Sequence, residues 1–348
     1  MSRTVEPRPG YQALEVYRRE APPVEINLAD NTNLFGSAPS ALASLGQWAV
    51  RSPASYPTLT TQELRESLAR WLGVTADAVL PGCGSNDLLD STMSALGVPG
   101  SALAHVSPTF VMGSHFAVAN SLVPIPVATR PDGQPDVEAL LATGAPIIYL
   151  ATPNNPSGQA ASADAVRTLM DRAPGIVLLD EAYTEYTGGS WAQEAVRRDN
   201  VVVTRTFSKA WGLAGLRIGY AVASPGLIYE IEKARGPYKV SAVAELAATA
   251  ALDHDGAWLE DLVATTRRGG GGGRQRLLAV RVDVAPTDTN FLSIPLRDPK
   301  AAVELMAGRG IGVRPFVDAP VVGSLIRVSI GPEPMMERFL EAVREGKA

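Results

Sequence analysis

The sequence has too few cysteines and histidines for a disulfide scaffold or a metal centre. Its 348 residues include one cysteine, Cys83, which has no partner for an internal disulfide. A lone cysteine is typical of a protein from a reducing cytoplasm. The three histidines, His105, His115 and His254, are scattered and do not have the spacing of zinc ligands. We therefore expect a cytoplasmic protein without a metal site.

The features of membrane proteins and of nucleic-acid-binding proteins are also lacking. No apolar run reaches the ~20 residues of a membrane span, and residues 1–7 lack the apolar core of a signal peptide. The formal net charge is −5, whereas a general nucleic-acid binder carries a basic face. These absences predict no membrane and no nucleic-acid partner, and they leave small molecules as the expected ligands.

Short apolar runs alternate with helical patterns between about residues 60 and 225. The runs at 147–150, 176–179 and 201–203 contain no polar alternation, which is typical of strands buried on both faces. Helical patterns lie between them, so a mainly parallel sheet covered by helices on both sides is expected. In such sheets ligands bind beyond the carboxyl ends of the strands.

From about residue 246 onward the pattern changes. Strands are predicted at 291–294, 312–314 and 325–329 and helices at 299–307 and 333–343, which indicates a smaller α+β domain. We expect residues 1–35 to form an N-terminal arm that contributes to the small domain and the active-site entrance. Residues 36–245 then form the large domain and residues 246–348 the small one. The run Gly269–Gly273 should be a break or a mobile loop, because each glycine costs about 1 kcal/mol in a helix relative to alanine.

Polar side chains follow each of the three buried runs. They are an amide, a carboxylate with a phenol, and a hydroxyl with an amine: Asn155, Asp180 with Tyr183, and Ser208 with Lys209. Arg217 comes shortly afterwards. A glycine turn at 84–86 precedes a predicted helix, whose free N–H groups favour an anion. We expect all these groups at one edge of the sheet.

Such a set of groups suits an aromatic aldehyde that carries a phosphate. Lys209 supplies an amine for a Schiff base, and Asp180 supplies a carboxylate that keeps a ring nitrogen protonated. The remaining candidates are Asn155 and Tyr183 for the ring oxygen, Ser85, Asn86, Ser208 and Arg217 for the phosphate, and Phe110 for stacking on the ring. Each residue alone is common in loops or cores, so the hypothesis depends on their joint occurrence in order.

Three segments closely resemble the motifs of fold-type-I aminotransferases, especially the histidinol-phosphate aminotransferase family. Residues 206–220 (TFSKAWGLAGLRIGY) resemble the lysine motif, and 153–158 (PNNPSG) and 180–183 (DEAY) match two further motifs in order and spacing. Weaker matches at 31–36, 55–57, 312–315 and 326–331 extend the resemblance over nearly the whole chain. Thr32 and Phe110 depart from the family pattern, which has an acidic residue and commonly a tyrosine there.

The resemblance implies a fold, a cofactor and a set of site residues. The expected fold is that of a fold-type-I transferase: a large α/β domain with a mainly parallel seven-stranded sheet between helices, plus a smaller α+β domain. The expected cofactor is pyridoxal 5′-phosphate, and the implied catalytic residues are Lys209, Asp180 and Tyr183. The implied cofactor contacts are Gly84, Ser85, Asn86, Phe110, Asn155, Asp180, Tyr183, Thr206, Ser208, Lys209 and Arg217, with Tyr56 reaching the cofactor of a second subunit in a homodimer with shared sites. The implied substrate contacts are Tyr11, Asn33, Arg314 and Arg327.

The predicted activity moves an amino group between an anionic amino compound and a 2-oxoacid such as 2-oxoglutarate. The donor expected is histidinol phosphate or an amino acid. A lyase, decarboxylase or cyclase with the same cofactor is an alternative, because sequence motifs do not fix which substrate bond is cleaved. A non-catalytic effector-binding domain is disfavoured by the complete lysine site. A dinucleotide-dependent oxidoreductase is disfavoured because residues 82–84 (GCG) lack the third glycine of that fingerprint.

Overall fold

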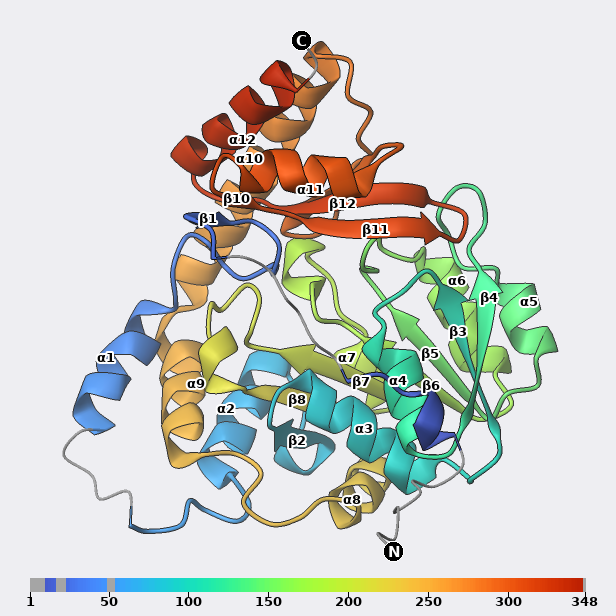
Figure 1. Cartoon of the computed structure of the whole chain (residues 1–348). Helices are drawn as coiled ribbons and strands as arrows, with labels where there is room; N and C mark the ends of the chain where they lie inside the picture. The colour runs from blue at the N-terminus through green and yellow to red at the C-terminus, as the bar shows by residue number, and fades with distance from the viewer. Residues whose placement is uncertain (1–9, 17–22, 49–53, 347–348) are drawn as a thin grey trace, which may run out of the picture.

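A seven-stranded sheet forms the centre of the larger part of the molecule (Figure 1). The structure is a computed structural model that describes residues 10–16, 23–48 and 54–346. The strand order is β2-β8-β7-β6-β5-β3-β4, and β8 alone runs antiparallel to its neighbours. The strands are β2 (Val79–Gly82), β3 (Ala102–Ser107), β4 (Val123–Ala128), β5 (Ile147–Ala151), β6 (Ile176–Asp180), β7 (Val201–Thr206) and β8 (Gly219–Val222). The predicted mainly parallel seven-stranded sheet is confirmed.

Helices cover both faces of this sheet. One face is covered by α3 (Ser85–Leu96), α4 (Met112–Ala119) and α8 (Pro225–Lys233). The other face is covered by α1 (Pro39–Trp48), α2 (Gln62–Leu72), α5 (Val137–Ala142), α6 (Ala163–Arg172), α7 (Ala192–Ala195) and α9 (Ala242–His254). Successive strand residues point to opposite faces, so Val177 and Leu179 pack in one core and Leu178 in the other. Both cores need apolar residues, which explains why these runs lack polar alternation.

A smaller antiparallel sheet, β11-β12-β9, lies above the first in Figure 1. Its strands are β9 (Phe291–Pro295), β11 (Arg314–Ala319) and β12 (Gly323–Ser329), with α11 (Pro299–Ala307) and α12 (Glu333–Glu345) beside them. The short strand β1 (Ile26–Asn27) pairs in parallel with β10 (Ile311–Gly312), and Ile26 and Leu28 pack in this smaller core. Residues 1–9 and 17–22 of the predicted arm lie outside the described residues. The domain boundaries at residues 36 and 246 stay predictions.

The prediction for the glycine run is wrong. Helix α10 (Gly256–Ala279) continues through Gly269–Gly273 without a break and climbs from the larger sheet to the smaller one (Figure 1). Leu259 and Leu262, before the run, pack in the core of the larger sheet, whereas Leu277, after it, packs in the smaller core. Because both ends of the helix are held by these cores, tertiary packing overrides the low helix propensity of glycine.

No helix in the described ranges is long and apolar enough to cross a membrane.

We predict that the glycine run lowers the stability of α10. At two of its positions packing does not require a glycine. A Cβ at Gly271 or Gly272 would meet no atom within 4 Å, so Gly271→Ala and Gly272→Ala should each raise the free energy of unfolding by about 1 kcal/mol. Gly270→Ala is the matched control and should gain less, because its Cβ would lie 2.9 Å from Ile330 Cδ1. Urea denaturation followed by circular dichroism measures these changes. If Gly271→Ala and Gly272→Ala both lowered the free energy of unfolding, the run would not be helical.

Candidate active site

A cavity of about 270 Å³ lies at the carboxyl ends of β5, β6 and β7, where β11 and β12 approach the larger sheet. The predicted site residues that line it are Ser85, Asn86, Phe110, Asn155, Asp180, Tyr183, Thr206, Ser208, Lys209, Arg217, Arg314 and Arg327. The structure thus brings the polar groups that follow separate strands to one place. Among the described residues, no group of histidine, cysteine or acidic side chains is arranged to hold a metal ion.

The amine and the carboxylate face the same cavity. Asp180 is the last residue of β6, and Lys209 follows the end of β7. Burial raises the pKa of Asp180 to about 6, while the hydroxyl of Tyr149, the backbone N–H of Ala182 and the charge of Lys209 act in the opposite direction. Lys209 Nζ donates to the backbone oxygen of Asp30 at 3.3 Å. A carboxylate buried in this way suits a protonated ring nitrogen as its partner.

Two side chains in the cavity have a free donor for a ring oxygen. Tyr183 accepts a hydrogen bond from Asn31 Nδ2 at 2.9 Å, which leaves its own O–H to donate. Asn155 Oδ1 accepts from Arg327 Nη1 at 2.6 Å, and the Asn155 Nδ2 group has no partner among the described residues. Both residues therefore offer donors, as expected from the sequence for groups that hold a ring oxygen.

Another group of residues that line the cavity has the chemistry of a phosphate site. Ser85 and Asn86 open helix α3, and its N-cap residue Gly84 provides no side-chain cap for the first N–H groups. Arg217 Nη1 donates to Ser208 Oγ at 3.3 Å, which brings the guanidinium to the hydroxyl. Helix N–H groups, hydroxyls and a guanidinium together favour a phosphate dianion. The residues present thus fit pyridoxal phosphate at its aldehyde, ring nitrogen, ring oxygen and phosphate.

Arg314 and Arg327 stand directly opposite each other on the antiparallel strands β11 and β12, and both line the cavity. Arg327 is buried and also donates to the backbone oxygen of Ala29 at 2.7 Å, and its guanidinium lies 5.6 Å from the ring centre of Phe316. The side chain of Arg314 makes no hydrogen bond or ion pair with any described residue. Two like charges opposite each other are unfavourable in a sheet, so this pair favours an anionic ligand.

Four predicted residues do not line the cavity. Gly84 is the N-cap residue of α3, with a positive φ of 79°. Tyr11 is exposed in the 3₁₀ turn η1 (Tyr11–Ala13), and Tyr56 is exposed with its ring stacked on Tyr238 at 4.6 Å. Asn33, expected to contact substrate, instead donates to the backbone oxygen of Ala210 at 2.9 Å and accepts from the N–H of Phe35. Asn33 therefore stabilises the loop that carries Lys209.

Three further residues at the site were not among the predicted ones. Asn31 lines the cavity and bonds Tyr183, although Asn33 was the expected contact. Phe316 forms an apolar wall beside the two arginines. Tyr149 contacts Asp180 from behind the cavity. The placement of Asn31 depends on its φ of 52°, which the sequence does not reveal, but a tyrosine within an apolar strand is a visible signal.

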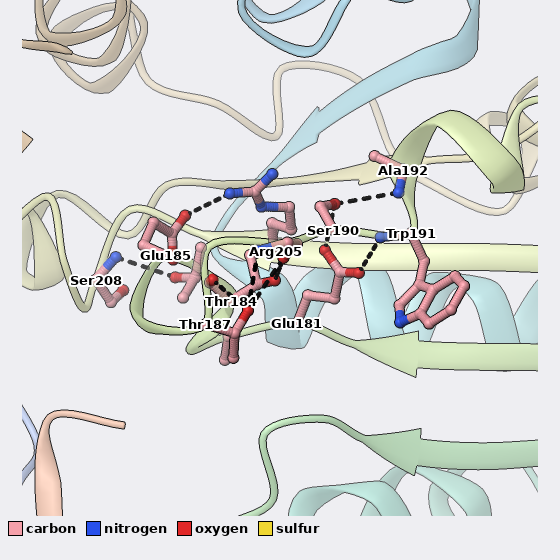
Figure 2. Close-up of polar contacts among 12 residues, drawn as sticks. Glu181, Thr184, Glu185, Thr187, Ser190, Trp191, Ala192, Arg205 and Ser208 are labelled. Carbon is pink, nitrogen blue, oxygen red and sulfur yellow. Dashed lines mark hydrogen bonds and ion pairs between the residues drawn. The ribbon is translucent and has the colours of Figure 1, made fainter. Parts of the chain in front are cut away.

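A buried polar network supports the segment that follows β6 (Figure 2). Glu181 accepts from Ser190 Oγ and from the N–H of Trp191, each at 2.6 Å, and Arg205 on β7 donates to Glu185 at 2.7 Å. Burial raises the pKa of Glu181, and the charge of Arg205 counteracts this. The network ties residues 181–191 to β7 and so fixes the segment that carries Asp180 and Tyr183.

Comparisons with known proteins agree with this geometry. The profile of the family "Aminotransferase class I and II" matches residues 23–343. The chain is 34% identical to a histidinol-phosphate aminotransferase of Methylobacillus flagellatus, over 97% of this chain and 94% of that protein. It is 35% identical to the histidinol-phosphate aminotransferase of Roseiflexus castenholzii, over 97% of each. The crystal structure of histidinol-phosphate aminotransferase from Sinorhizobium meliloti in complex with pyridoxal-5′-phosphate superposes with a TM-score of 0.88 at 26% identity, over 99% of this chain and 98% of that one.

We predict that Gly84 is required for the position of Arg217. A Cβ at Gly84 would lie 2.6 Å from Arg217 Nη2, so Gly84→Ala should displace the guanidinium and lower the affinity for pyridoxal phosphate about tenfold or more. Fluorescence titration of the apoprotein with the cofactor measures this affinity.

Gly215→Ala is the control for this substitution, because its Cβ would meet nothing within 4 Å. Equal cofactor affinities for the two variants would contradict the role given to Gly84.

Proposed function

The chain belongs to the class I and II aminotransferase family, and from this membership we propose that it moves the amino group of an anionic amino compound to a 2-oxoacid. It is an aminotransferase that depends on pyridoxal 5′-phosphate. The proposed donor is histidinol phosphate or an amino acid, and the proposed acceptor is 2-oxoglutarate or a similar oxoacid. The observation that carries the proposal is that Lys209, Asp180 and the arginine pair line the same cavity.

Pyridoxal phosphate, when bound, supplies an aldehyde for the amine and a ring that accepts electrons. We infer that Asp180 keeps the ring nitrogen protonated and that Tyr183 and Asn155 donate to the ring oxygen. Ser85, Asn86, Thr206, Ser208 and Arg217 hold the phosphate, and Phe110 covers the ring. Lys209 carries the proton at the substrate Cα. For this the amine must be neutral when it accepts the proton.

The arginine pair supports an anionic substrate. Arg327 already has partners in Asn155 and Ala29, whereas the Arg314 side chain has none among the described residues. A carboxylate or phosphate placed between them removes the repulsion across the strand pair. Phe316 beside Arg327 gives the same region an apolar surface, which suits a donor whose anion is joined to an apolar or ring-bearing part.

We further propose a cytoplasmic homodimer with shared active sites. The exposed ring of Tyr56 lies outside the cavity of its own chain, which is consistent with service to the cofactor of a second subunit. The exposed thiol of Cys83 is consistent with a reducing compartment.

The proposed activity predicts a strict need for an oxoacid. Purified holoenzyme should convert a donor only when 2-oxoglutarate is present, with glutamate formed in equal amount. The donors to screen first are histidinol phosphate, aromatic amino acids and basic amino acids, with product analysis by mass spectrometry. Lys209→Ala is the inactive control, and borohydride reduction should fix the cofactor on Lys209. Release of carbon dioxide or ammonia without an oxoacid would instead identify a decarboxylase or lyase.

The two arginines should differ when each is replaced. Arg314→Gln should raise KM for anionic substrates about 10- to 100-fold and leave the thermal midpoint unchanged, because the side chain has no partner among the described residues to lose. Arg327→Gln should raise KM and also lower the thermal midpoint, since Asn155 and Ala29 lose their bonds. Steady-state kinetics and thermal unfolding measure these effects. An unchanged KM for every anionic substrate in Arg314→Gln would refute its anchoring role.

A further inference from the structure

A tyrosine hydroxyl supports the carboxylate of Asp180 from a position outside the cavity. Tyr149 OH donates to Asp180 Oδ2 at 3.0 Å. Tyr149 is fully buried and is not among the residues that line the cavity, so neither substrate nor cofactor touches it there. The hydroxyl therefore acts on any bound group only through the carboxylate.

The sheet register determines this contact. Ala151 on β5 pairs with Asp180 on β6, and Tyr149 pairs with Leu178, so Tyr149 and Asp180 project from the same face of the sheet. They are offset by two positions along the strand direction, and the length of a tyrosine side chain spans that diagonal. A tyrosine at position 149 can therefore reach the Asp180 carboxylate from the neighbouring strand.

Helix α4 leaves room for the ring of Tyr149. A Cβ at Gly113 would lie 2.5 Å from Tyr149 Cε1, so the helix passes the ring at a residue without a side chain. The ring also belongs to the core formed with Leu103, Ile147 and Leu178. Close packing of this kind leaves the hydroxyl one position, at the carboxylate.

The charges around the carboxylate keep the hydrogen bond in one direction. Burial and the charge of Asp180 raise the pKa of Tyr149 well above its usual value, so the phenol stays protonated and donates. The other groups that act on the Asp180 carboxyl are the N–H of Ala182, the charge of Lys209 and the hydroxyl of Thr204, and Tyr183 acts on Tyr149. Tyr149 gives the largest effect that opposes the rise in the pKa of Asp180 caused by burial.

We propose that Tyr149 is a positioning residue of the aminotransferase site, whose hydroxyl holds the Asp180 carboxylate ionised and oriented toward the ring nitrogen of the cofactor. The inference rests on the proposed function, because it assigns Asp180 to that nitrogen. Without the hydroxyl Asp180 becomes more basic and draws the ring proton toward itself. The ring then carries less positive charge and accepts electrons less well.

The test is the absorbance of the holoenzyme as a function of pH, with Tyr149→Phe and the wild type compared. A less positive ring lets the nitrogen that joins Lys209 to the cofactor keep its proton to higher pH. The midpoint of the absorbance change should therefore rise by about one pH unit, and kcat should fall about tenfold with KM unchanged. Tyr186→Phe is the matched control. It removes a hydroxyl from another buried tyrosine, for which no bond to Asp180 exists, and should leave the midpoint and kcat as in the wild type.

A double-mutant cycle with Asp180→Asn separates positioning from packing. In the Asp180→Asn background, Tyr149→Phe should cause no further change in the midpoint. If Tyr149→Phe fails to fold but the double variant folds, the tyrosine compensates the buried charge, as proposed. An unchanged midpoint in folded Tyr149→Phe, or failure of both variants to fold, would overturn the proposal. The absorbance titration needs no substrate, so a wrong proposed activity would show in the oxoacid assay and leave this result intact.

Discussion

A buried negative charge at the end of β6 is the constraint on which the site depends. Asp180 is only 3% exposed, and a carboxylate in such a place is stable only among donors and a cation. Tyr149 reaches it from β5, Ala182 from its own loop, and the charge of Lys209 acts from the segment after β7. Three separate pieces of chain therefore have to arrive at one point, and the parallel sheet brings them there because its strand ends share an edge.

Glu181, the residue after Asp180, stabilises the fold through contacts on the side away from the cavity. Glu181 bonds Ser190 and Trp191, and Arg205 joins Glu185 across to β7, so the segment after β6 is held from behind while Asp180 faces the cavity. A site on so rigid a support keeps its donors in place when the ligand is absent, which lowers the cost of ordering them on binding. The buried charges beneath the site thus contribute to its geometry.

The sequence predicted β5, β6 and β7 because strands buried on both faces are apolar throughout, and the groups that follow them converge as expected. No strand was predicted at β4, whose two prolines, Pro124 and Pro126, fit only the edge of the sheet. The glycine run was misjudged because local propensity ignores the two cores that hold α10. Asn31 and Asn33 differ by two positions, and only the backbone conformation decides which one faces the cavity.

One link between the smaller sheet and the loop after β5 is the side chain of Arg327. Arg327 belongs to β12, yet its guanidinium donates to Asn155 Oδ1 in the loop after β5, and Asn155 is the residue proposed to donate to the ring oxygen of the cofactor. Under the proposed function, an anion bound between Arg327 and Arg314 contacts the same guanidinium that holds a proposed cofactor contact. Since charge-assisted bonds are sensitive to geometry, this linkage makes substrate recognition and cofactor alignment depend on the same approach of the two sheets.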